Sequence, residues 1–369
     1  MAGSTFGNIF KITTWGESHG KGIGVVVDGC PSGLPLCEED IQIFLNRRKP
    51  GQSQYSTMRS EDDAVEILSG IFEGKTTGTP ISMVVFNKTQ RSSDYSDIAS
   101  YYRPGHADYT FDEKYGFRDY RGGGRSSGRE TIGRVAAGAI AAKLLSELGI
   151  SVSAYSKSIG GISIDYKNFD EGYIMENPLY MPDKEAVERV LPILDEKKAA
   201  GNSVGGVIEC VVKNMMTGVG EPVFDKLDAR LAQAIMSIGA VKAVEIGDGV
   251  AVADSFGTTN NDSFHYNKDG ELIKLTNHAG GILGGISDGS DIILRATVKP
   301  TPSIYSSQDT VNKAGENISI QIKGRHDPII VPRAVVVVEA MTAITILDSL
   351  LMSMTSTLDG VKRFFTKKD

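Results

Sequence analysis

The sequence predicts an α+β fold, and two observations lead to that class. Strand-like runs rich in β-branched residues recur at residues 81–86, 204–212 and 292–298, and helical segments lie between and after them. The two kinds of segment do not alternate regularly, as they would in a doubly wound parallel sheet. A chain of 369 residues can bury a large core, and its length alone leaves one or two domains open.

The first predicted elements are two strands joined by a loop that has glycine at both ends. Residues 8–14 and 22–29 are β-rich, and residues 16–20 between them read Gly-Glu-Ser-His-Gly. Ser18 and His19 are therefore expected on a strand connection, where polar side chains are accessible to a ligand.

A short amphipathic helix is predicted over residues 38–49. Apolar residues recur at i, i+3 and i+4 from Ile41, and a Pro-Gly pair follows the segment. Arg47 and Arg48 fall in its last turn, where any cation also interacts favourably with the helix dipole.

The clearest helix signal begins at Ser127. Ser127 and Glu130 match the two ends of a capping box, an alanine-rich run continues to Leu148, and Gly149 stops it. The preceding loop brings glycines, serines and Arg125 to the positive end of this helix. Free backbone amides at a helix start, together with arginine, predict an anion site there.

Two more helices and two irregular regions complete the prediction. Helices are expected at about 224–238 and 332–354, each with apolar residues on one side. Residues 256–276 and 302–324 are polar and rich in turn residues, so we expect long surface loops or hairpins.

Charge and cysteine content exclude several classes of protein. A formal net charge of −7 argues against nonspecific nucleic-acid binding, so anion-binding residues must form local clusters. Three scattered cysteines are too few for a disulfide framework or a four-ligand zinc site, and we expect no metal. No apolar run approaches the roughly 20 residues that a bilayer requires, and no signal peptide is visible. We therefore expect a cytoplasmic protein with no membrane partner.

Several familiar motifs are absent or incomplete. Residues 70–76 approach a P-loop but have three residues between the glycines where four are required. No Gly-x-Gly-x-x-Gly occurs at the spacing of a dinucleotide site. Ser18, His19 and Asp327 could form a hydrolase triad, but no Gly-x-Ser-x-Gly elbow supports it.

Three separated motifs resemble the signatures of the chorismate synthase family. They are GESHG at residues 16–20, RGGGRSSGRET at 121–131 and GRHDP at 324–328. Further similar segments are RPGHADY at 103–109, EPVFD at 221–225, NHAGGILGGI at 277–286 and KPT at 299–301. The similarity covers nearly the whole chain in register, so chance agreement is negligible.

The resemblance implies a fold, an assembly and a reaction. The fold would be a β-α-β sandwich in which antiparallel sheets cover a helical layer, formed by a single domain over residues 1–369 and assembled as a homotetramer. The reaction would be the anti-1,4-elimination of phosphate from 5-enolpyruvylshikimate 3-phosphate, which gives chorismate. The family uses reduced FMN without net redox change, so an external flavin-reducing system is an expected partner.

The resemblance also assigns roles to individual residues. His106 would protonate the departing phosphate, His19 would support the reduced cofactor, and Asp327 would relay the ring proton. Flavin contacts would come from Arg125, Ser126, Ser127, Gly239, Ala240, Gly284, Lys299, Pro300, Thr301, Pro302, Ser303 and Arg325. Substrate oxyanions would meet guanidinium groups, first that of Arg48 and then those of Arg47, Arg103, Arg129 and Arg134.

Alternatives remain at this stage. An isolated histidine in a glycine loop is often structural, and an Asp-Pro pair such as that at Asp327 is also a common turn. Gln54 stands where relatives often have an arginine, and Gly239 stands where they often have an asparagine. Relatives often use these two residues for ligand contacts. A flavin oxidoreductase that uses NADPH, or a noncatalytic flavin- or phosphate-binding relative, would share much of the same sequence.

Overall fold

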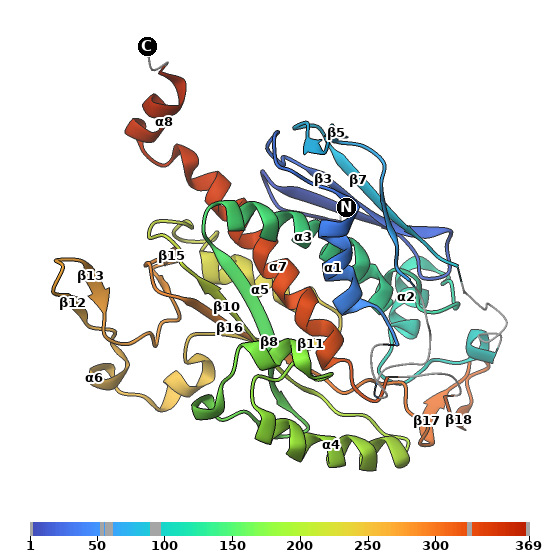
Figure 1. The fold of residues 1–369 in the computed structure, drawn as a ribbon. Helices are drawn as coiled ribbons and strands as arrows, with labels where there is room; N and C mark the ends of the chain where they lie inside the picture. The colour runs from blue at the N-terminus through green and yellow to red at the C-terminus, as the bar shows by residue number, and fades with distance from the viewer. Residues whose placement is uncertain (1–2, 52–54, 56–61, 89–96, 323–326, 367–369) are drawn as a thin grey trace.

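Two five-stranded antiparallel sheets enclose a layer of helices (Figure 1). The computed structural model describes residues 3–51, 55, 62–88, 97–322 and 327–366. This arrangement confirms the predicted α+β class and the helical layer covered by antiparallel sheets.

The first sheet is formed by the N-terminal part of the chain and has the order β1-β2-β3-β7-β4. Its strands are β1 (Thr5–Phe6), β2 (Lys11–Gly16), β3 (Gly22–Asp28), β7 (Ile81–Phe86) and β4 (Val65–Ile67). Ile23 and Val25 on β3 are buried against the helical layer. The loop between β2 and β3 carries His19, as the sequence predicts.

The second sheet is formed by the middle of the chain and has the order β11-β16-β10-β8-β9. Its strands are β11 (Val241–Ile246), β16 (Ile292–Val298), β10 (Gly206–Lys213), β8 (Ser151–Ile159) and β9 (Ile162–Ser163). In the register of β10, Cys210 pairs with Leu294 on one side and Ala154 on the other, and all three side chains are buried.

The helices lie between the sheets or at the edges of the sandwich. They are α1 (Glu38–Arg48), α2 (Asp108–Tyr115), α3 (Thr131–Glu147), α4 (Lys184–Ala199), α5 (Leu227–Met236), α6 (Gly257–Asn260), α7 (Val331–Met352) and α8 (Leu358–Phe365). Helix α3 packs on β2 and β3, and α7 packs on β8 and β10, so each of these helices faces one sheet. Helix α8 projects from the body at the C-terminal end (Figure 1).

Short hairpins occupy the surface regions. They are β5 (Ile71–Phe72) with β6 (Lys75–Thr76), β12 (Phe264–Tyr266) with β13 (Leu272–Lys274), β14 (Ile282–Leu283) with β15 (Ile286–Ser287), and β17 (Gln308–Val311) with β18 (Asn317–Ile320). Two of them lie within the polar regions 256–276 and 302–324, where hairpins or loops were predicted.

The predicted helix after Ser127 begins differently from expectation. Ser127 does act as a cap, since its hydroxyl accepts a hydrogen bond from the backbone N–H of Arg129, but it caps a 3-10 turn that precedes α3. The Glu130 carboxylate accepts hydrogen bonds from Thr14 (3.0 Å) and Arg134 (2.9 Å). The expected capping box is therefore wrong in its second half, because Glu130 ties α3 to β2.

Other predicted helix bounds hold with small differences. Helix α1 agrees with its prediction to one residue. Helix α5 starts three residues later than expected, because Val223 has a left-handed φ of 67° and Phe224 is exposed. Helix α4 was not predicted, although Asp183 supplies a recognisable N-cap by accepting hydrogen bonds from two backbone N–H groups.

Helix α7 is buried on all sides rather than on one face. The segment Val331–Thr355 is long and apolar enough to cross a membrane by length and composition, contrary to the expectation that no apolar run comes near that length. In the structure, 83% of its most apolar window is buried inside the protein. Packing against α1, α3, α5 and the second sheet explains its composition, so it is a core helix.

Helices α3 and α7 approach closely at one glycine. A Cβ atom added to Gly138 would lie 2.3 Å from Cβ of Ala340 and 2.5 Å from its Cα. Only a residue without a side chain permits this contact, which joins the helices that carry the two sheets.

We expect Gly138→Ala to lower the free energy of unfolding by about 1–3 kcal/mol, because the backbones of α3 and α7 must separate. Urea unfolding followed by circular dichroism measures the change. Gly257→Ala in α6 is the control, since no atom lies within 4 Å of its added Cβ. Equal stability of the two variants would contradict the role assigned to Gly138.

Candidate active site

The imidazole of His106 is hydrogen-bonded on both sides, to its own segment and to the segment 299–303. Its Nδ1 lies 3.0 Å from the Pro104 carbonyl oxygen and its Nε2 lies 3.0 Å from the Ser303 hydroxyl. Lys299 donates a hydrogen bond to the carbonyl of Gly105 at 3.0 Å. The histidine motif and the 299–303 segment, which are far apart in sequence, therefore form one unit.

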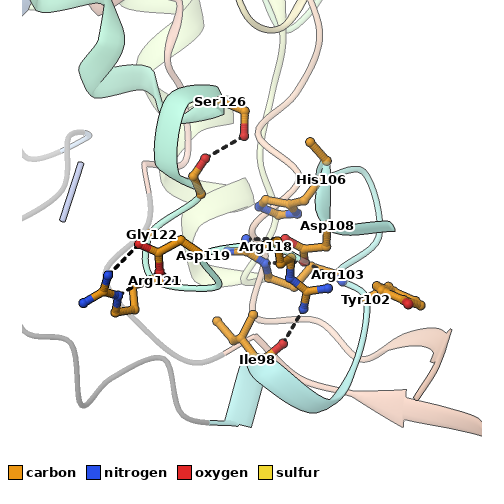
Figure 2. Close-up of polar contacts among 12 residues, drawn as sticks. Ile98, Tyr102, Arg103, His106, Asp108, Arg118, Asp119, Arg121, Gly122 and Ser126 are labelled. Carbon is orange, nitrogen blue, oxygen red and sulfur yellow. Dashed lines mark hydrogen bonds and ion pairs between the residues drawn. The ribbon is translucent and has the colours of Figure 1, made fainter. Parts of the chain in front are cut away.

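The histidine segment is supported by buried ion pairs. Arg103 donates from Nε and a terminal nitrogen to both carboxylate oxygens of Asp108, each at 2.8 Å, and Arg118 lies near the same carboxylate. Figure 2 shows these three side chains grouped next to His106. Burial raises the pKa of Asp108, but hydrogen bonds from Arg103 outweigh it and hold that pKa below its usual value.

Burial, followed by the positive charge of Arg103, lowers the pKa of His106 from 6.5 to about 4. The imidazole is therefore neutral at pH 7 in the free protein. A bound anion would oppose both effects, because negative charge stabilises the imidazolium.

His19 is packed beneath the glycine-rich loop. It is 8% exposed, and a Cβ added to Gly122 would lie 2.3 Å from its imidazole ring. Ser18 donates a hydrogen bond to the Gly122 carbonyl at 3.2 Å. Since Gly122 also has a φ of 67°, only glycine suits this position, and the loop lies directly on the histidine.

Arg48 and Arg129 share one buried carboxylate. A terminal nitrogen of Arg48 lies 3.0 Å from Oδ2 of Asp63, and a terminal nitrogen of Arg129 lies 3.2 Å from Oδ1. Arg48 is 1% exposed and also donates to the Gly128 carbonyl at 3.1 Å. Burial lowers the pKa of Arg48 to about 10; Asp63 opposes this shift, whereas the nearby guanidinium group of Arg333 adds to it.

Asp327 belongs to the same network of charges. Its Oδ2 lies 2.6 Å from a terminal nitrogen of Arg333, whose Nε donates to the Arg48 carbonyl at 3.1 Å. Three guanidinium groups, those of Arg48, Arg129 and Arg333, thus lie close to only two carboxylates. The excess of positive charge suits an oxyanion.

The segments that carry these residues are joined in a closed series of contacts, which we call the circuit around His106. From the His19 loop it runs through Asn87, which accepts from Arg129 Nε at 3.1 Å and donates to the Gly20 carbonyl at 2.9 Å. The arginine network then leads to Asp327. Next to Asp327, the Pro328 carbonyl accepts a hydrogen bond from the Val204 N–H at 3.0 Å, and the Ser203 hydroxyl donates to the Thr301 carbonyl at 2.7 Å. The 299–303 segment leads to His106, and the segment that carries Asp108 and Arg118 leads back to the glycine-rich loop.

Some predicted arginines are engaged elsewhere. Both terminal nitrogens of Arg47 donate to the Glu339 carboxylate, at 2.7 and 2.8 Å, inside the helical layer. Arg134 donates to Glu130 and, at 2.6 Å, to the Ser237 hydroxyl at the end of α5. These pairs give Arg47 and Arg134 clear structural tasks.

The segments predicted to contact flavin meet in part. The Lys299 N–H donates to the Ala240 carbonyl at 2.9 Å, so residues 239–240 adjoin the 299–303 segment. Arg125 donates to the Gly16 carbonyl at 3.1 Å and to the Thr14 hydroxyl at 2.7 Å, which fixes the loop carrying Ser126 and Ser127 to β2. Arg325 and Gln54 lie outside the described residues.

Gly284 is the predicted flavin residue that the fold separates from the others. It precedes Gly285, whose carbonyl accepts from Leu227 at the start of α5, whereas Gly239 follows the end of that helix. A helix of ten residues is about 15 Å long, so the two glycines lie well apart in one chain.

A cavity of about 830 Å³ opens elsewhere, on the second sheet. Glu209 lies at its base and accepts hydrogen bonds from Tyr155 (2.5 Å), Tyr166 (2.6 Å), Lys157 (3.2 Å) and Arg295 (3.2 Å). None of the predicted site residues lines this cavity, and its buried carboxylate already has four donors. The circuit around His106, by contrast, contains residue types that can bind and protonate a phosphate.

Sequence reasoning missed the partners that hold the predicted residues. Asp63, Asn87 and Asp108 were not candidates. Asp108 adjoins the histidine motif and so carried a local signal. Asp63 and Asn87 carried none, because only tertiary contacts bring them to the arginines.

Comparisons with known proteins show the family of the chain. The family model described as chorismate synthase matches residues 10–351. The chorismate synthase of Lachnospira eligens is 68% identical over 367 residues, which is 100% of both chains. The chain belongs to the chorismate synthase family.

More distant relatives give the same result. The chorismate synthase of Syntrophobacter fumaroxidans is 54% identical over 95% of this chain and 98% of its own. A solved structure named "Crystal Structure of Chorismate Synthase" matches with a TM-score of 0.76 and 33% identity, over 98% of this chain and 97% of that chain.

Membership of the chorismate synthase family gives the activity. It is a lyase reaction of the shikimate pathway, in which 5-enolpyruvylshikimate 3-phosphate loses phosphate to give chorismate. The family implies a small-molecule substrate and, in general, a flavin cofactor.

The lowered pKa of His106 predicts a specific pH dependence of stability. Between about pH 6.5 and pH 4 the unfolded chain binds the proton and the native chain does not, so the free energy of unfolding falls as pH falls. His106→Gln removes this contribution. We expect the stability difference between wild type and variant to be constant above pH 7 and to shrink in acid, as measured by urea unfolding at matched protein concentration. Parallel pH curves down to pH 4 would contradict the assignment.

Proposed function

We propose that the circuit around His106 is the active site at which this chain eliminates phosphate from 5-enolpyruvylshikimate 3-phosphate with the help of reduced FMN. The observation that supports the proposal is the series of contacts that links the segments carrying His19, His106 and Asp327, from three separate motifs, to an arginine network of excess positive charge. Phosphate departure needs an acid and cationic donors, and both are present.

His106 is proposed as the acid for the leaving phosphate. In the free protein it is neutral, because burial and Arg103 lower its pKa. A phosphate dianion bound beside it stabilises the imidazolium, so the proton is taken up together with the substrate and delivered to the departing oxygen. Ser303, hydrogen-bonded to Nε2, fixes the direction of that nitrogen.

Arg48 and Arg129 are proposed to hold substrate oxyanions. Arg129 is partly accessible, with a side chain 10% exposed, whereas Arg48 lies behind it and is buried. The Nε of Arg48 is also buried and has no hydrogen-bond partner among the described residues. A buried guanidinium with an unused donor is a strong partner for an anion that reaches it.

Asp327 and His19 are proposed for the other half of the reaction. Asp327 is oriented by its 2.6 Å contact with Arg333 and receives the proton that leaves the ring. His19, held under Gly122, supports the flavin from the loop between β2 and β3. Arg103, paired with Asp108, keeps the His106 segment in place and is not assigned a direct substrate contact.

The described residues fit a flavin. The hydroxyl oxygen of Thr301, in the segment predicted for the cofactor, is buried and has no hydrogen-bond partner among the described residues. An added Cβ at Gly239 or Gly284 would meet no atom within 4 Å, so there is open space beside both. When bound, reduced FMN supplies electron density for cleavage of the allylic C–O bond and recovers it, without net oxidation.

We also propose a single domain, a homotetramer, a cytoplasmic setting and an external flavin-reducing system. One hydrophobic core runs from Phe10 to Leu347, which supports a single domain. The distance between Gly239 and Gly284 supports an assembly, because a second protomer can bring the separated flavin segment to the site. The absence of a dinucleotide motif in the sequence supports reduction from outside.

Anaerobic turnover tests the proposed cofactor role. With dithionite-reduced FMN and 5-enolpyruvylshikimate 3-phosphate, we expect chorismate and phosphate to form in equal amounts over many turnovers, with the flavin still reduced. Activity with oxidised FMN under strict exclusion of reductant would contradict the proposal.

Arg48→Lys tests the substrate pocket. Lysine keeps the charge but loses the planar fork, so we expect kcat/KM to fall at least tenfold, or by about 1.4 kcal/mol. Arg230→Lys is the matched control, because Arg230 is buried and paired with Asp348 at 2.5 Å away from the site. Arg230→Lys should lower Tm while kcat/KM stays within about twofold of wild type. Unchanged kinetics in Arg48→Lys would remove Arg48 from the pocket.

A further inference from the structure

Asp63 occupies an unusual position at the centre of the arginine network. Its residue is 3% exposed, and its side chain is fully buried. One carboxylate oxygen faces Arg48 at 3.0 Å and the other faces Arg129 at 3.2 Å. The two guanidinium groups come from the end of α1 and from the 3-10 turn before α3, and the Asp63 carboxylate lies against both of them.

The backbone of Asp63 is strained. Its φ is 45°, in the left-handed region that is unfavourable for a residue with a side chain. Such a conformation persists only where neighbouring contacts hold it. Here they include the Gln42 side chain, which donates to the Asp63 carbonyl at 3.3 Å. In this backbone conformation the Asp63 carboxylate lies between the two arginines.

Charge balance explains why a carboxylate is needed at this point. Arg48, Arg129 and Arg333 are close enough for the last two to lower the pKa of the first. Without a negative group between them, Arg48 and Arg129 would repel each other and separate. A separated pair cannot present donors to the same anion.

We propose that Asp63 is a positioning residue that holds Arg48 and Arg129 at the spacing required to bind the substrate's oxyanions. This inference rests on the proposed function, since it assumes that these two arginines contact substrate. Asp63 itself contacts no substrate, because its carboxylate is enclosed by the arginines. Its effect is therefore expected mainly in KM.

Asp348 provides a matched comparison for Asp63. Its carboxylate is also buried and paired with an arginine, Arg230, and it accepts hydrogen bonds from the backbone N–H groups of Asn8, Ile9 and Phe10. It fixes the N-terminal segment to α7. Asp348→Asn thus makes the same chemical change in a buried ion pair that has no part in the proposed site.

The first test is Asp63→Asn, which keeps the size of the side chain and tolerates a left-handed φ. We expect KM for 5-enolpyruvylshikimate 3-phosphate to rise at least tenfold and kcat to change less than threefold. The inhibition constant of inorganic phosphate, measured as a competitor, should rise in parallel. Asp348→Asn should lower Tm without moving either constant by more than about twofold.

The second variant, Asp63→Gly, guards against a failure of Asp63→Asn to fold, because glycine adopts φ of 45° without strain. It removes the carboxylate and leaves space for formate. We expect a raised KM that falls again, at least threefold, on addition of formate but not of an equal concentration of chloride. Affinity for oxidised FMN, measured by fluorescence, should stay within twofold of wild type.

The outcomes separate this inference from the proposed function. If Arg48→Lys and Arg129→Lys raise KM but both Asp63 variants keep wild-type KM and phosphate inhibition, the positioning role is wrong and the pocket stands. If the arginine variants also keep wild-type kinetics, the pocket itself is wrong. A lower Tm in the Asp63 variants, with KM unchanged, would mean that Asp63 has only a structural role and would overturn the inference.

Discussion

The close contact between α3 and α7 sets the spacing of the two sheets. Each helix carries one sheet, and Gly138 allows their backbones to approach at Ala340. Gly133, five residues earlier on α3, faces the first sheet: a Cβ added to it would lie 3.0 Å from a methyl carbon of Thr14 and 3.1 Å from the Gly24 carbonyl oxygen. The small residues of α3 therefore fix the separation of the layers. Because α3 starts at the glycine-rich loop, the same contact also fixes the position of the site.

Buried ion pairs connect neighbouring helices and fix their positions along one another, which apolar contacts alone specify less strictly. Arg47 of α1 pairs with Glu339 of α7, and Arg230 of α5 pairs with Asp348 of α7. Charges so deeply buried add little net stability, but they allow only one register, since a shifted helix would leave a charge unpaired. The Arg48–Asp63 pair follows the same rule at the edge of the site. Buried arginine–carboxylate pairs are thus found both between the helices and at the proposed anion site.

The electrostatics of the proposed site suit a charged substrate. Three guanidinium groups share two carboxylates, and burial with the charge of Arg103 lowers the pKa of His106 to about 4. A rigid set of donors that is already desolvated gains more from an incoming phosphate than a solvated one, because little reorganisation is required. The separate cavity at Glu209 shows the opposite arrangement, in which the donors are already used by a buried carboxylate.

The sequence by itself determined the local elements and the chemical motifs. Strand runs and the amphipathic pattern of α1 depend on neighbouring residues, so they could be predicted, and the three family motifs made His19, His106 and Asp327 candidates. Local reasoning placed Glu130 in a capping box, whereas the fold uses it to tie α3 to β2. Only the tertiary contacts show which carboxylate each arginine meets. Arg47 and Arg48 are adjacent in sequence, yet helical geometry points one at Glu339 and the other at Asp63, because successive residues on a helix face different directions.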